Sequence, residues 1–143
     1  MARIMALDYG QKRTGIAVTD PMQMIASPLT TIPTYKAIPF LQAYTQKESI
    51  SLFVIGWPLQ LDGKEGPATR LVASFMRMLK RYFPDIPVIP YDERFTSLLA
   101  QYGILQLDLP KKKRQEKGRL DRMSAAIILE SFMESKEAMA LKV

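Results

Sequence analysis

The sequence contains neither histidine nor cysteine among its 143 residues. Without these side chains there is no Ser-His-Asp triad, no cysteine nucleophile, no histidine acid–base pair and no ordinary zinc site. The lack of cysteine also excludes a disulfide scaffold and favours a reducing compartment. No apolar run reaches the roughly 20 residues that span a bilayer, and the first residues do not resemble a secretory signal. We therefore expect a cytoplasmic protein without a membrane segment.

Length and charge give the next expectations. A chain of 143 residues with 48% hydrophobic residues has the size and composition of one domain with its own core, so we expect a single domain over residues 1–143. The net charge of +6 is concentrated between residues 111 and 122, where seven basic residues face two acidic ones. The basic residues are Lys111, Lys112, Lys113, Arg114, Lys117, Arg119 and Arg122. Such a segment favours binding to a polyanion, although charge alone is equally compatible with a solvated loop.

Three acidic residues occupy positions where an apolar run ends or a helix is expected to begin. Asp8 closes an apolar run at residues 3–7, Glu93 follows residues 88–91, and Asp121 opens an expected helix. Separated carboxylates that a fold brings together suit Mg²⁺ or Mn²⁺, because hard cations take oxygen ligands. Local explanations exist as well: Asp8 fits a turn that accepts backbone N–H groups, and an acid in a first helical turn is favoured by the helix dipole.

The apolar pattern predicts a mixed α/β fold. Alternation and β-branched residues predict strands, the first two as a hairpin, at residues 3–8, 13–20, 24–32, 52–55 and 88–91. Helical periodicity predicts helices at residues 35–48, 66–82, 96–103 and 120–136. Pro28 places the third strand at an edge or a bulge. In the second helix the expected apolar stripe comprises Leu71, Phe75, Met78 or Leu79, and Tyr82. This order predicts an antiparallel first half of the sheet and a second half joined by crossovers.

Four motifs, in this order, resemble the YqgF (RuvX) family over almost the whole chain. They are Leu7-Asp8-Tyr9-Gly10-Gln11-Lys12-Arg13-Thr14-Gly15-Ile16-Ala17-Val18-Thr19-Asp20, Gly56-Trp57-Pro58-Leu59 with Asp62-Gly63, Asp92-Glu93-Arg94-Phe95-Thr96-Ser97 and Leu120-Asp121-Arg122-Met123-Ser124-Ala125-Ala126-Ile127-Ile128-Leu129. The resemblance implies an RNase H-like fold, with a mixed five-stranded sheet flanked by helices and a relationship to Holliday-junction resolvases. It also implies a bacterial nuclease that processes the 5′ end of pre-16S ribosomal RNA.

Carried over to this sequence, the resemblance assigns Asp8, Glu93 and Asp121 as catalytic ligands of one or two Mg²⁺ or Mn²⁺ ions. Only one of Asp92 and Glu93 is expected to face Asp8, because successive residues leave a strand on opposite sides, and the resemblance favours Glu93. Nucleic-acid contacts are expected from Lys12, Arg13, Arg94, Lys111, Lys112, Lys113, Arg114, Lys117 and Arg119.

Other functions stay open. RNA is the favoured partner and branched DNA is the alternative, since resolution of a Holliday junction needs two active sites and hence a homodimer, whereas RNA processing is compatible with a monomer. A basic binding module without catalysis would bind nucleic acid with or without metal. The Asp-x-Gly turn also resembles that of actin-like kinases, which need a much longer chain. Trp57 is a candidate for base stacking, but a residue that caps the core is the simpler interpretation, and the nine methionines are expected to fill the core.

Overall fold

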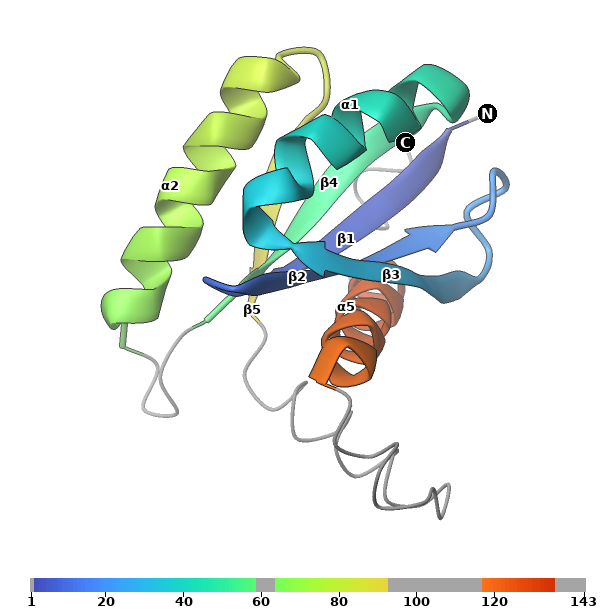
Figure 1. Cartoon of the computed structure of the whole chain (residues 1–143). Helices are drawn as coiled ribbons and strands as arrows, with labels where there is room; N and C mark the ends of the chain where they lie inside the picture. The colour runs from blue at the N-terminus through green and yellow to red at the C-terminus, as the bar shows by residue number, and fades with distance from the viewer. Residues whose placement is uncertain (1, 59–63, 93–116, 136–143) are drawn as a thin grey trace.

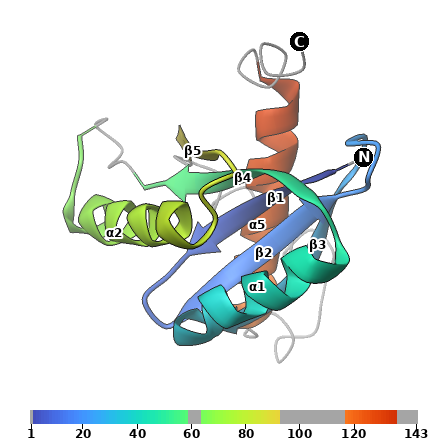
Figure 2. The same cartoon turned by 90° about the horizontal axis from the view of Figure 1, so that it is seen from above.

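A five-stranded mixed sheet lies between two layers of helices (Figure 1). The computed structural model describes residues 2–58, 64–92 and 117–135, with the side chains of residues 117–120 left out. The strand order is β3-β2-β1-β4-β5. Helices α1 (Ala37–Lys47) and α2 (Pro67–Tyr82) cover one face, and α5 (Lys117–Glu134) covers the other, as the view from above also shows (Figure 2). The predicted α/β class and mixed five-stranded sheet are confirmed.

The first half of the sheet is an antiparallel meander, as predicted. Strand β1 (Arg3–Tyr9) pairs with β2 (Arg13–Thr19), which pairs with the edge strand β3 (Ala26–Pro33). The register between β2 and β3 shifts where Ile16 pairs with Thr30 and Ala17 pairs with Pro28. Proline has no N–H to donate to a ladder, so an edge strand with an irregularity accommodates it.

The second half of the sheet is parallel. Strand β4 (Ile50–Trp57) pairs with β1, and β5 (Val88–Asp92) pairs with β4. A short 3₁₀ helix, η1 (Thr34–Lys36), and α1 connect β3 to β4, while α2 precedes β5. The carboxyl ends of β1, β4 and β5 therefore meet at one edge of the sheet, which we call the carboxyl edge. The expected helix at residues 96–103 lies outside the described residues.

Side-chain alternation divides the core between the two faces. On the α1/α2 face, Met5, Leu7 and Ile16 pack with residues of both helices. On the α5 face, Ile4, Ala6 and Ala17 pack against a fully buried stripe of α5 that comprises Ala125, Ile128, Leu129 and Phe132. None of the helices in the described ranges combines the length and apolar character needed to cross a membrane.

Two expectations about packing need correction. The buried residues of α2 are Thr69, Val72, Phe75, Met76 and Leu79, whereas Leu71, Met78 and Tyr82 of the predicted stripe are exposed. Phe75 and Leu79 belong to both sets, and helical periodicity alone does not determine which side of the helix faces the sheet. The methionines are also not all core residues, because Met22 and Met24 are 58% and 72% exposed.

Candidate active site

Asp8 lies at the carboxyl edge, on the face covered by α5. Residues Ile4 and Ala6 of β1 pack on the α5 side, and Asp8 follows them in the same alternating series. Its neighbours Leu7 and Tyr9 belong to the opposite face. The Asp8 side chain is half-buried. A half-buried carboxylate at the end of a central strand is available to both solvent and a helix that passes over that end.

Asp121 comes to the same edge from α5. The helix begins at Lys117, so Asp121 is not in its first turn, which contains no acidic residue. This corrects the expectation that Asp121 opens the helix and weakens the helix-dipole explanation, since that effect falls off within the first turn. Asp121 is in line with Ala125, Ile128 and Phe132, all fully buried against the sheet. Its position on this stripe directs Asp121 toward the sheet rather than toward bulk solvent.

Gly15 lies next to both Asp8 and the main chain of Asp121. In the β1–β2 ladder Gly15 is the partner of Asp8, and paired residues project to the same face about 4.5–5.5 Å apart. A Cβ added to Gly15 would lie 2.1 Å from the carbonyl oxygen of Asp121 and 2.7 Å from the nitrogen of Arg122. The main chain of Asp121 therefore lies within about 9 Å of the Asp8 Cα. The absence of a side chain at position 15 allows α5 to approach the end of β1 this closely.

Arg13 connects the same two elements by an ion pair. Its Nε donates to Oδ2 of Asp121 at 3.0 Å, with the Arg13 and Asp121 side chains 38% and 24% exposed. Arg13 was expected to bind phosphate and Asp121 to bind a metal ion, and the structure pairs them with each other. The exposed Lys12 lies in the turn before Arg13, where its carbonyl oxygen accepts the N–H of Thr34.

Strand β5 places Asp92 on the face of the sheet opposite to Asp8. Ile89 and Tyr91 face α5, and the Tyr91 hydroxyl lies 2.7 Å from the Ser131 hydroxyl on that helix. Asp92, the last residue of β5, is exposed and alternates to the other face. Glu93 lies outside the described residues, as do Arg94 and the basic residues 111–114, and for Lys117 and Arg119 only the helical backbone is described. Within the described ranges there is no group of three acidic residues placed to hold a metal.

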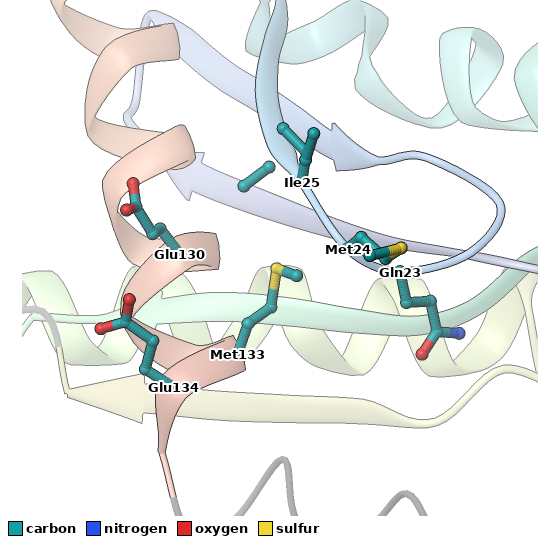
Figure 3. Close-up of a pocket in the computed structure, with 7 residues that line it drawn as sticks. Gln23, Met24, Ile25, Glu130, Met133 and Glu134 are labelled. Atoms are coloured by element: carbon teal, nitrogen blue, oxygen red, sulfur yellow. The ribbon is translucent and has the colours of Figure 1, made fainter.

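A large hollow lies at the opposite end of the sheet. It has a volume of about 520 Å³ and is formed by the β2–β3 loop and the last turns of α5. Met133 of α5 points toward the loop that carries Gln23 and Met24, while Glu130 and Glu134 line the hollow from the helix (Figure 3). The Gln23 side chain donates to the Ala2 carbonyl oxygen, which locates this loop at the start of β1. This hollow is therefore separate from the Asp8 edge.

Gly15 was quoted from the sequence only as part of a motif, and the structure gives the reason for a glycine there, which is the close approach of α5. The sequence does contain a signal for this contact, namely a glycine inside an otherwise regular strand, because such a residue often marks close approach of another backbone. Tyr9 was quoted only as part of a motif, and its ring packs on Phe75 with centroids 4.8 Å apart.

Comparison with solved structures defines the class of fold. RuvC from Thermus thermophilus in complex with Holliday junction substrate has a TM-score of 0.53 at 13% identity, covering 94% of this chain and 97% of that chain. A second Thermus thermophilus RuvC structure has a TM-score of 0.51 at 13% identity, covering 96% of each chain. The fold is thus the RNase H-like fold of these structures.

Sequence comparison identifies the family. A family model described as "RuvX: Holliday junction resolvase" matches residues 2–135. Two relatives, both named "Putative pre-16S rRNA nuclease", come from Phocaeicola vulgatus and Flavobacterium johnsoniae. The first is 47% identical over 96% of this chain and 99% of the relative, and the second is 48% identical over 95% and 99%. The chain belongs to the RuvX family, and the resemblance to the YqgF (RuvX) motifs is confirmed.

Proposed function

We propose that this protein is a divalent-metal-dependent nuclease, formed by a single domain, that processes the 5′ end of pre-16S rRNA in the cytoplasm. The observation that carries the proposal is the approach of α5 to β1 at Gly15, which brings the distant residues Asp8 and Asp121 to one face of one sheet edge. The names of the relatives supply the RNA substrate, and the family supplies the class of enzyme.

The donor chemistry of the edge fits a hard divalent cation. Asp8 and Asp121 offer carboxylate oxygens, and the sequence contains no histidine or cysteine that would favour a softer metal. Glu93 is the third proposed ligand, because the family resemblance favours it over Asp92, which alternates away from α5. When bound, Mg²⁺ or Mn²⁺ would neutralise phosphate charge and lower the pKa of a water molecule.

The residues of the chain have separate tasks in this proposal. Asp8, Glu93 and Asp121 hold the metal, and the Nε of Arg13 orients the carboxylate of Asp121 through their 3.0 Å contact. The remaining guanidinium N–H groups of Arg13 are directed to substrate phosphate, because a guanidinium has five donors in a fixed fork. Further phosphate contacts come from Lys12, Arg94, Lys111, Lys112, Lys113, Arg114, Lys117 and Arg119.

Cleavage of labelled RNA by carboxylate variants tests the proposal. Asp8→Asn and Asp121→Asn keep the shape of the side chain and remove its charge, so each should abolish cleavage of precursor rRNA in Mg²⁺ or Mn²⁺ while circular dichroism stays unchanged. Asp92→Asn is the matched control, because Asp92 lies on the other face, and it should cleave like the wild type. Full activity of Asp8→Asn, or equal cleavage in EDTA, would overturn the proposal.

The family description and the fold shared with RuvC favour a second candidate, resolution of Holliday junctions. A four-way DNA junction in the same gel series distinguishes the two substrates. Resolution requires two cuts related by a two-fold axis, so it should be accompanied by a homodimer in sedimentation at the assay concentration. A non-catalytic module, by contrast, would bind RNA equally well in Mg²⁺ and EDTA and would cut neither substrate.

A further inference from the structure

Helix α2 exposes an apolar stripe that the fold does not use. Leu71, Met78 and Tyr82 are 38%, 45% and 51% exposed, and their spacing along the helix places them on one side of it. Tyr35 of η1 is 80% exposed on the same face of the sheet. Large apolar side chains that gather on a surface, rather than scatter singly, mark an interaction site.

Of these residues, Tyr35, Leu71 and Met78 line a hollow at the carboxyl edge, which we call the Tyr9 hollow. Its volume is about 260 Å³, and it lies between the end of β1, the η1–α1 segment and α2. Tyr9 and Phe75 contribute packed rings with centroids 4.8 Å apart, and Tyr35, Leu71 and Met78 complete its apolar lining. Pockets for drug-sized molecules measure about 300–1,000 Å³, so this hollow suits one smaller flat ring system.

The charged residues of α2, which forms one wall of the Tyr9 hollow, are all basic. Helix α2 carries Arg70, Arg77, Lys80 and Arg81 and no acidic residue. A second hollow of about 220 Å³ is lined by Arg77 and Arg81 and shares Ser74 and Met78 with the first. The guanidinium of Arg77 is turned toward the shared wall, since its Nη2 donates to Oγ of Ser74 at 3.0 Å. Lys36 adds a further cation, with its Nζ 5.6 Å from the centre of the Tyr35 ring.

An apolar, aromatic hollow with adjoining arginines matches the chemistry of a nucleotide in a single strand. Aromatic side chains stack on unpaired bases, and basic residues contact the backbone phosphates beside them. A second copy of this chain is a poor match, because the protein has a net charge of +6 and an α2 surface without acidic side chains would face like charge. Complementarity of charge therefore favours a polyanion with exposed bases.

We propose that the Tyr9 hollow binds one unpaired base of the nucleic-acid strand, while Arg77 and Arg81 contact the flanking phosphates. The assignment of this strand as the substrate rests on the proposed nuclease function. Tyr9 and Asp8 are consecutive in β1 and face opposite sides of the sheet. A strand held in the hollow thus reaches the Asp8 face by passing around the end of β1, so the hollow selects substrates with an unpaired nucleotide near the cleavage position.

Binding measured without cleavage provides the first test. Labelled single-stranded RNA, single-stranded DNA and double-stranded RNA are titrated in EDTA and followed by fluorescence anisotropy. Tyr35→Ala should weaken single-strand binding about tenfold, since loss of one base–aromatic stack costs 1–3 kcal/mol and 1.4 kcal/mol is tenfold. Tyr35→Phe keeps the ring and should bind like the wild type. Binding of the duplex should be unchanged by Tyr35→Ala, because its bases are paired.

Two kinds of control separate stacking from general effects. Met24→Ala removes an exposed apolar residue at the far end of the sheet, and Lys47→Gln removes an exposed charge at the end of α1; both should leave single-strand affinity unchanged.

Arg77→Gln and Arg81→Gln together should lower the log–log salt slope by about 1.4, which is roughly 0.7 per phosphate contact on a single strand. An oligonucleotide that contains 5-iodouridine should form photo-crosslinks to peptides carrying Tyr9, Tyr35 or Phe75.

The outcomes distinguish this proposal from the nuclease proposal. Unchanged affinity in Tyr35→Ala, or crosslinks confined to other peptides, overturns the base-binding hollow even if Asp8→Asn abolishes cleavage. A tenfold loss with mapped crosslinks supports the hollow even if cleavage never depends on Asp8. If Tyr35→Ala changes only the sedimentation coefficient and not RNA affinity, the surface is a contact between copies and the proposal is wrong. A difference between the RNA and DNA arms identifies which strand the hollow prefers.

Discussion

Replacing Gly15 with alanine should destabilise the protein, although the same change in an unobstructed strand has the opposite effect. The new Cβ would lie 2.1 Å from the carbonyl oxygen and 2.2 Å from the carbonyl carbon of Asp121, where ordinary contacts begin near 3.4 Å. Both atoms are main chain, so rotation of a side chain gives no relief. The start of α5 must withdraw by about 1 Å, which is a large displacement in a close-packed interior.

The magnitude follows from two opposing terms. Alanine in place of glycine in a strand gains about 0.5–1 kcal/mol from the unfolded chain. Overpacking in a well-packed region costs about 1–3 kcal/mol, and α5 has little freedom to retreat because Ala125, Ile128 and Phe132 are fully buried below this point. With the overpacking cost near the upper end of that range, we expect a net loss of about 2 kcal/mol, equivalent to a melting temperature about 6 °C lower for a chain of this size.

Urea unfolding followed by Trp57 fluorescence and circular dichroism measures this loss. Gly66→Ala is the control, because Gly66 has extended backbone with φ −129° and should change stability by less than about 1 kcal/mol. Cleavage of precursor RNA should fall about 100-fold in Gly15→Ala, as expected when one ligand of a site moves by 1 Å. A Gly15→Ala protein as stable and as active as the wild type would refute the close approach of α5 and the site geometry derived from it.

Three further predictions concern charged groups. In a double-mutant cycle of Arg13→Gln and Asp121→Asn, the coupling measured by urea unfolding should stay below about 1 kcal/mol, because the partly exposed pair is screened by solvent; a value of about 3 kcal/mol would contradict this. The pKa of Asp20 is held below 3.8, chiefly by the N–H of Ile25 and also by those of Met24 and Met22, so the ionised form is the stabilising one. The stability lost in Asp20→Asn should therefore be full above about pH 5 and disappear as the pH falls through the folded-state pKa, and a pH-independent loss in urea midpoints would argue against this cause. Replacing Lys111, Lys112, Lys113 and Arg114 with Gln should reduce the salt slope of RNA binding by roughly 0.7 for each lost contact, and an unchanged slope would show that this segment is only solvated.

Local patterns in the sequence predicted most of the sheet. Two properties of a strand can be seen in its own residues. The alternation of β1 and β2 and the continuous apolar run of β4 show which faces are buried, and the proline in β3 shows where no N–H group is needed. Trp57 confirms the simpler of its two interpretations, because it packs against the core on the α1/α2 face. These features are local, and each can be recognised without knowledge of the partner.

Features that depend on a distant partner were not predictable in the same way. The start of α5 was expected at residue 120, whereas the helix begins at Lys117. The buried face of α2 was predicted incorrectly because the helix sequence has two overlapping apolar stripes. The Arg13–Asp121 ion pair joins residues far apart in the chain, and no local rule indicates it.

In the proposed function, the two ends of the sheet have different roles. At the amino end of β1, polar groups are satisfied within the protein: Arg3 donates to Glu48 at 3.2 Å and to the Thr19 carbonyl at 2.9 Å, and the Gln23 side chain donates to the Ala2 carbonyl at 2.8 Å. At the carboxyl edge, the same strand ends in a half-buried carboxylate beneath a helix that approaches only because residue 15 has no side chain. In the proposed function this edge holds the cation, so Asp8→Asn should abolish cleavage. Arg3→Gln should instead lower the urea midpoint and leave cleavage unchanged, because its partners Glu48 and Thr19 lie at the opposite end of the sheet.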